Sequence, residues 1–220
     1  VDMAREMAAR DYAPRPLLPE AWRDLTYDQY RKIWFDSRNA LWEGLAAPQR
    51  VDVFPPGLYF PQAIRTYVVE NGQARPMQFD MGVFDTTDKF PDVPIDDTLG
   101  YSGLRLRAEL RQPGIYEEYA VFQGASYFRA LGRNMSYGLS ARAVAIGTGG
   151  PNPEEFPRFT HLRLHPAIGT SVRLEAVIDS PALAGHLDMV LHPGDDTRMD
   201  VTVTLMPRRT VPDIGIAPLT

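Results

Sequence analysis

Apolar and polar residues alternate with a period of two along most of the chain. Strict alternation is typical of β-strands that bury one face. Four segments show it clearly, with these residues on the expected inward face: Leu104, Leu106, Ala108 and Leu110; Val172, Leu174, Ala176 and Ile178; Leu187, Met189 and Leu191; Val201, Val203 and Leu205. At near-regular spacing we count about twelve strands, which predicts an all-β protein.

Turn residues separate these strands. Asn71-Gly72 lies between two extended runs and is the strongest short hairpin signal, so we expect a type I′ turn with positive φ at both residues. HPGDDT, residues 192–197, predicts a second turn. Since one face of each strand is polar, the expected fold is a large, mostly antiparallel β-sandwich.

One helix is predicted, at the N-terminus. MAREMAAR, residues 3–10, is rich in helix formers, Asp2 is a candidate cap, and the prolines of YAPRPLLPE end the helix. We therefore divide the chain into a helix with a proline-rich lead-in, residues 1–26, and a β-sandwich domain, residues 27–220.

Composition narrows the possible functions. The net charge of −5 argues against binding to nucleic acid, and no apolar run approaches the roughly 20 residues that span a bilayer. The absence of cysteine excludes disulfides and thiolate metal sites. We expect no cofactor and no metal.

The acidic and histidine motifs point only weakly to chemistry. Glu154 and Glu155 could be functional carboxylates, although paired acids before a strand are commonly a solvated loop. His161 and His165 share a strand face but lie too far apart to bind zinc without a third ligand, so a surface pair is expected. The acids Asp92, Asp96 and Asp97 lack the spacing of a calcium loop.

Two glycine-containing motifs are equally weak. GTGG, residues 147–150, lacks the lysine and helix of a phosphate loop and is expected to connect two strands. Ser126 in GASYF lacks the second glycine of a nucleophile elbow, so a role as nucleophile is not expected.

The segment VFQGASYFRALG, residues 121–132, combines aromatic rings with arginine. Alternation puts Phe122 and Phe128 on the core face, with Gly124, Ser126 and Ala130, and puts Tyr127 and Arg129 on the other face. Tyrosine rings stack on sugars and guanidinium groups donate to hydroxyls, so this second face suits carbohydrate binding. A salt-bridged sheet without a ligand is the alternative. We expect Tyr137, Arg142 and Arg158 to lie near the same groove.

Several motifs resemble the periplasmic glucan biosynthesis protein family (OpgG/OpgD, also MdoG/MdoD). The resemblance extends over the chain and rests on these motifs, in this order: LTYDQYRKIWF, ALW, KFPDVPIDDTLGYSGLRL, FQGASYFRALG, YGLSARAVAI, EEFPRF, DSP and GIAPLT. It implies a galactose-mutarotase-like β-sandwich that is followed by a smaller immunoglobulin-like domain. It also implies a secreted, periplasmic protein whose signal peptide is removed or not included.

The same resemblance implies that the partner is β-1,2-glucan and that the full-length protein tailors this glucan, in some members as an inverting β-1,2-glucanase. A non-catalytic scaffold that guides the nascent glucan is the alternative. The catalytic acids of the family are expected beyond Thr220, so no catalytic residue is assigned here. Strand edges left open near Thr220 are expected to be covered by further segments or by a second copy, as in a homodimer.

Overall fold

The computed structural model describes residues 1–85, 87, 91–151 and 153–220. Its helices and strands are the following: α1 (Asp2–Ala8), α2 (Glu20–Arg23), α3 (Tyr27–Tyr30), two 3₁₀ turns (Ser37–Asn39 and Met81–Val83), β1 (Gln49–Phe54), β2 (Arg65–Glu70), β3 (Gln73–Pro76), β4 (Gly103–Glu109), β5 (Tyr116–Gln123), β6 (Tyr127–Ala130), β7 (Leu139–Arg142), β8 (Val144–Ile146), β9 (Arg158–Leu164), β10 (Val172–Asp179), β11 (Leu183–His192), β12 (Arg198–Pro207) and β13 (Ile214–Ile216).

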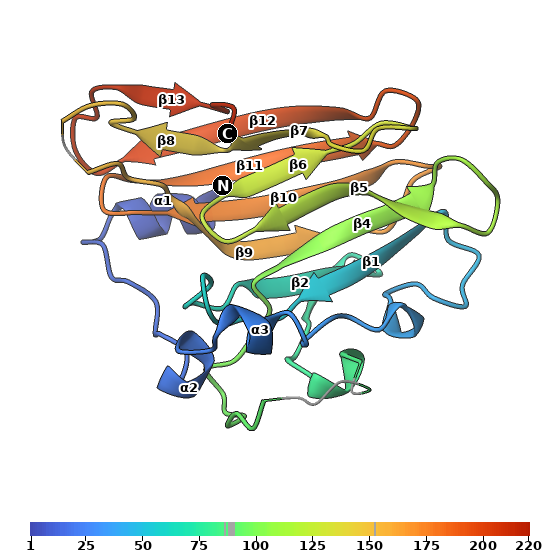
Figure 1. The fold of residues 1–220 in the computed structure, drawn as a ribbon. Coiled ribbons are helices and arrows are strands. Elements are labelled where there is room, and N and C mark those ends of the chain that lie inside the picture. Colours follow the sequence, from blue (N-terminus) through green and yellow to red (C-terminus); the bar gives the residue numbers. More distant parts are fainter. Residues whose placement is uncertain (86, 88–90, 152) are drawn as a thin grey trace.

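The strands form two stacked sheets, which confirms the all-β sandwich (Figure 1). One sheet has five strands in the order β1-β4-β5-β6-β7, and the other has six in the order β12-β11-β10-β9-β2-β3. A short third sheet pairs β13 with β8. Neighbouring strands run antiparallel except β2 and β9, which are parallel.

The main core fills the space between the two sheets. Leu104, Leu106 and Phe122 of the five-stranded sheet and Leu174 and Leu187 of the other sheet are fully buried there. The alternation predicted for β4, β10 and β11 is confirmed, since every residue placed on their inward faces is buried.

The prediction for β12 is wrong in part. Val201 is 40% exposed, and Val203 and Leu205 are only partly buried against the core. β12 is the outermost strand of its sheet, so one of its long sides has no neighbouring strand in the described chain. At this position the apolar face of the sheet is therefore less completely covered than at β10 and β11.

The predicted turns are confirmed. Asn71 and Gly72 have φ angles of 51° and 77° and connect β2 to β3, as a type I′ turn requires. Residues 193–197 connect the paired strands β11 and β12. The GTGG motif, residues 147–150, follows β8, and Ile146 at the end of that strand is bridged to Glu155.

The N-terminal region differs from the prediction in two ways. Val1, not Asp2, is the N-cap of α1, and the Asp2 carboxylate accepts a hydrogen bond from Arg5 within the helix. Two further helical turns, α2 and α3, follow the proline-rich segment. The second of these is stabilised by a capping box between Thr26 and Gln29. Each is a single turn, which is too short to show helical periodicity.

Two smaller cores hold this region on the sandwich. Trp22 and Leu25 are buried with Val53 and Tyr101 beside α2 and α3, which lie at the β1 and β2 end of the sandwich (Figure 1). Helix α1 packs through Ala4 on the outer face of β10 and β11. The domain division at residues 26 and 27 stays a prediction.

The segment from Val121 to Gly132 is not one continuous strand. Its first residues end β5, Gly124 to Ser126 form a turn, and β6 runs back alongside β5. Phe122 is paired with Phe128, so both still face the core, although Phe128 is only partly buried. The two phenylalanines therefore share one face of the β5–β6 hairpin, and Gln123 and Tyr127 share the other. Gly124 and Ser126, which were expected on the core face, belong to the turn.

Candidate functional site

A groove runs over the outer face of the five-stranded sheet. It consists of two adjoining cavities, of about 480 Å³ and 400 Å³, that share Phe60 and Gln123. The larger is lined by Tyr59, Phe60, Gln123, Ala125, Tyr127, Arg142, Phe156 and Arg158. The smaller is lined by Tyr30, Arg31, Ile33, Trp34, Phe35, Val53, Phe54, Pro55, Phe60, Arg105 and Gln123.

Strand register builds the floor of the groove. Gln123, Tyr127 and Arg142 lie side by side on β5, β6 and β7 as directly paired residues. Side chains in such a row point to the same face of a sheet, which here is the face opposite Phe122. The walls are formed by residues 55–60 after β1, by Tyr30 at the end of α3 with residues 31–35 after it, and by Phe156 before β9.

Local contacts fix the polar groups of the floor. The Arg142 guanidinium stacks on the Phe156 ring at 4.3 Å, and its Nη1 donates to the Ala125 carbonyl at 2.8 Å. The Gln123 amide donates to Ser102 Oγ at 2.9 Å, which leaves its carbonyl oxygen as an acceptor. Aromatic stacking on a guanidinium restricts its orientation without consuming its remaining N–H groups.

Two arginines of the groove lack carboxylate partners. Most arginines of the described chain lie within 4 Å of a carboxylate, but neither Arg142 nor Arg158 lies this close to one that the structure describes. Two of the aromatic walls are also exposed: Tyr59 is 70% exposed and Trp34 is 48% exposed. Exposed rings next to guanidinium groups with free donors form a surface suited to polyhydroxylated ligands.

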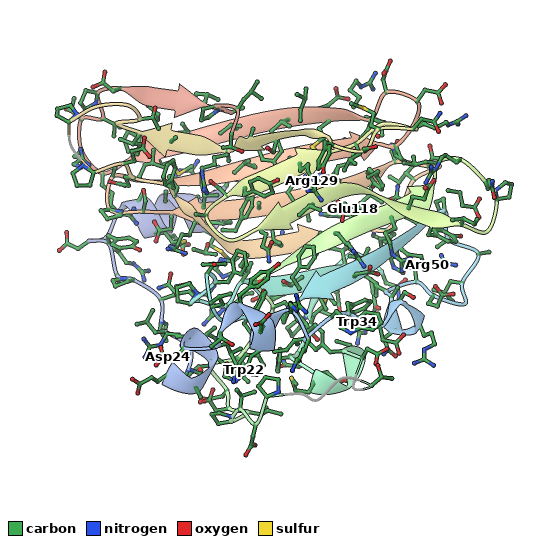
Figure 2. All side chains as sticks on the ribbon, in the orientation of Figure 1. Trp22, Asp24, Trp34, Arg50, Glu118 and Arg129 are labelled. Atoms are coloured by element: carbon green, nitrogen blue, oxygen red, sulfur yellow. The ribbon has the colours of Figure 1, made fainter. Side chains whose placement is uncertain are left out.

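The sequence-predicted residues separate into two groups. Tyr127, Arg142 and Arg158 meet in the larger cavity. Arg129 lies on the same sheet face but outside the groove lining, where it donates to Glu118 of β5. Figure 2 shows these two side chains next to each other on the strands. Tyr137 is 87% exposed and does not line the groove.

Glu154 and Glu155 also lie outside the groove lining. Glu154 accepts a hydrogen bond from the Gly149 amide at 3.1 Å and closes its own loop. Glu155 accepts from the Ala182 amide at 2.8 Å and pairs with Arg209 at 3.4 Å. Both carboxylates thus connect loops in this structure.

A buried ion-pair network lies next to the groove on the same sheet face. Asp52 is fully buried between Arg105, whose Nε donates at 2.6 Å, and Arg107, whose Nη2 donates at 2.9 Å. Glu118 lies between Arg105 and Arg129. For these residues the structure favours the alternative hypothesis given above, a sheet face that is held together by ion pairs and binds no ligand.

Sequence reasoning missed the walls of the groove. Tyr59, Phe60 and Trp34 are in irregular segments, where alternation carries no information. The segment PPGLYFPQ, residues 55–62, could have indicated this wall. Its two aromatic residues lie between prolines, which are rare inside strands, so the rings are not expected to belong to a strand of the core. Phe156 lies in EEFPRF, a motif that carries the family resemblance but does not predict where the ring lies.

The two histidines do not act together. His161 stacks beside Tyr67 at 6.3 Å between ring centroids, whereas the His165 ring nitrogen contacts Glu175 at 2.7 Å. Asp96 accepts from the Thr98 amide and hydroxyl, which accounts for it as a turn residue. Within the described residues, no cluster of three or more histidines and acids is arranged to hold a metal.

His161 should make stability depend on pH. Burial first, then the charges of Arg15, Arg65 and Arg163, lower its pKa from 6.5 to about 4. Between these values the unfolded chain binds a proton that the folded protein does not, so unfolding is favoured as the pH falls from about 6.5 to about 4. The melting temperature at pH 7.5 and pH 5 should therefore differ less in His161→Gln than in wild type. An equal decrease in both proteins would contradict this.

Comparisons with known proteins identify the family of the chain. The family model described as "Periplasmic glucan biosynthesis protein, MdoG" matches residues 1–220. Glucans biosynthesis protein G of Shewanella sp. (strain ANA-3) is 38% identical over 223 residues and that of Rhodopseudomonas palustris (strain BisA53) 40% over 221, which covers 100% and 99% of this chain. The protein of the same name from Vibrio cholerae serotype O1 (strain M66-2) is 39% identical over 224 residues.

The chain spans less than half of the length of these relatives, 41% to 44%. Among the described residues, no helix has the length and apolar character needed to cross a membrane. The match of the family model over residues 1–220, together with relatives of about 40% identity, shows that the chain belongs to the periplasmic glucan biosynthesis family.

Proposed function

We propose that the groove binds a glucan chain and that this protein takes part in the biosynthesis of periplasmic glucans through that binding. The observation that carries the proposal is the combination of exposed rings, Tyr59 and Trp34, with two arginines that lack carboxylate partners in the described chain, Arg142 and Arg158. Rings stack on the C–H faces of sugars, while guanidinium groups donate to hydroxyls.

The size of the groove supports an oligosaccharide ligand. Its two cavities adjoin and together extend from Trp34, past Phe60 and Gln123, to Arg158. Two adjoining cavities of about 480 Å³ and 400 Å³ offer room for a ligand of more than one sugar unit. We propose β-1,2-linked glucose as the backbone of this ligand, as the resemblance in the sequence implies. The family description makes the periplasm the expected compartment.

For the residues described here we favour binding over hydrolysis. An inverting glycosidase uses two carboxyl groups, commonly about 6.5–9.5 Å apart. Among the described residues, the groove lining contains arginine, glutamine and aromatic side chains but no carboxylate. Hydrolysis by the full-length protein would need acids from other parts of the protein, so this part is proposed to supply the binding wall.

Calorimetric titration of the full-length protein with linear β-1,2-gluco-oligosaccharides tests the proposal. Arg158→Gln is expected to weaken binding about tenfold or more, as for the loss of a hydrogen bond from a charged donor. Tyr59→Ala should also weaken binding, because it removes a stacking surface. Both residues are on the groove surface, so the melting temperature should change little.

Two matched controls lie outside the groove. Tyr137→Ala removes another highly exposed tyrosine, and Arg133→Gln removes an arginine that pairs with Asp195. Both variants should bind as wild type does. If Tyr59→Ala and Arg158→Gln also bind normally, the groove is not the glucan site. Incubation with the same glucan, followed by product analysis, separates a hydrolase from a scaffold.

A further inference from the structure

A further cavity, of about 410 Å³, shares no lining residue with the groove. We call it the hairpin cavity, because residues of the β2–β3 hairpin form one side of it. The segment 97–100 and the lead-in at Arg15 and Pro16 form the others. Pro76, Met77, Phe79 and Leu99 give it apolar surface, and Thr66, Gln78 and Thr98 give it polar groups.

Two arginines line this cavity without carboxylate partners. Arg15 is half-buried and donates to the Thr160 carbonyl, and Arg65 is an exposed residue on β2. Neither lies within 4 Å of a carboxylate in the described chain, unlike Arg163 and Arg75 nearby, which pair with Glu175 and Glu70. Two guanidinium groups that share a cavity repel each other unless an anion lies between them.

The positive charges of the two arginines affect each other and a neighbouring histidine. Burial and the charge of Arg65 both lower the pKa of the Arg15 guanidinium from its ordinary value. Arg15 and Arg65 also contribute to the depressed pKa of His161, which stacks on Tyr67 at the side of the cavity. The one acid in the cavity lining is Asp97, which is exposed and not within 4 Å of either arginine.

We propose that the hairpin cavity binds a small organic anion, whose phosphate or carboxylate group is held between Arg15 and Arg65. Guanidinium forks match the oxygen geometry of both groups and bind them in a bidentate manner. The cavity volume is in the range of small-ligand pockets and exceeds what a bare ion needs. Its apolar wall at Pro76, Met77 and Phe79 suits the body of a sugar-sized ligand.

Calorimetry on the full-length protein, with glucose 6-phosphate, glucuronate and glucose as probes, tests this inference. Glucose 6-phosphate, glucuronate or both should bind, with an affinity that falls as salt is added, and glucose should not. Binding by only one of the two anions identifies the charged group. Arg65→Gln should weaken binding about tenfold or more, as expected for a charge-assisted hydrogen bond.

Arg75→Gln is the matched control. It makes the same change on the same hairpin, but Arg75 pairs with Glu70 and does not line the cavity. It should bind the anion as wild type does. If neither anion binds, or if Arg75→Gln weakens binding as much as Arg65→Gln, the inference is wrong. Arg65→Gln should leave binding of neutral β-1,2-gluco-oligosaccharide unchanged, so the two proposed sites can fail separately.

Discussion

Replacing Asp52 by asparagine is expected to lower the free energy of unfolding by about 3–5 kcal/mol. The Asp52 carboxylate is fully buried on β1 and accepts from Arg105 and Arg107, which are themselves at most one-third exposed. Without it, two guanidinium charges stay largely enclosed beside the sheet with no carboxylate between them. The measurement is urea unfolding of the full-length protein, monitored by circular dichroism.

Asp188→Asn is the control for this substitution. Asp188 also accepts from an arginine, Arg173, but the two side chains are 35% and 44% exposed. Solvent screens such a pair, so its loss should cost no more than about 1 kcal/mol. If Asp52→Asn costs no more than Asp188→Asn, the network beside the groove does not stabilise the sheet.

Phe122→Ala should destabilise the protein by about 3–5 kcal/mol, because it leaves a cavity between the two sheets. The Phe122 ring is fully buried and lies 6.2 Å from the Phe128 ring and 6.4 Å from the Phe159 ring, between centroids. It therefore connects β5 to β6 and to β9 of the opposite sheet. Thermal and chemical unfolding measure the effect.

Phe128→Ala provides the comparison, since it removes the same ring from the neighbouring strand. Phe128 is only partly buried, so less apolar surface is lost and the expected cost is smaller than for Phe122→Ala. If both substitutions lower the free energy of unfolding equally, the difference in burial between Phe122 and Phe128 does not determine stability, which would contradict the prediction.

The sequence predicted the inward faces of β4, β10 and β11 correctly and that of β12 only in part. The alternating residues of β4, β10 and β11 are buried in the core between the two sheets. β12 has the same alternation but an exposed Val201, because the pattern records which face is apolar and not what covers it. Coverage depends on tertiary neighbours, which a single sequence does not show.

The turn at residues 124–126 was missed for a similar reason. A continuous strand and a hairpin with a three-residue turn both place Phe122 and Phe128 on the same face, so alternation cannot distinguish them. Positive φ at Gly124 and Ser126 makes the reversal. Glycine often marks a turn because it readily adopts positive φ, but serine rarely does, so the sequence at Ser126 did not indicate a reversal.

The candidate site was predictable only where strands build it. Alternation placed Tyr127 on the face opposite Phe122, and in the structure Arg142 is the residue paired with it on β7. Arg129 shares that face, but its partner Glu118 is on β5, and which residues pair across strands is not visible in either strand alone. The loop residues Tyr59 and Trp34 could not be placed, because loop conformation follows from contacts that are distant in sequence.

The single parallel pairing has a consequence for the order of folding. β9, β10, β11 and β12 are consecutive in the chain and pair with their sequence neighbours, so their contacts are local. β2 joins this sheet through pairs such as Arg65 with His161, and closing so long a loop costs conformational entropy before any contact compensates for it. Non-local pairing of this kind slows folding. The four C-terminal strands therefore pair through short connections, and we expect β2 to join their sheet in a later step.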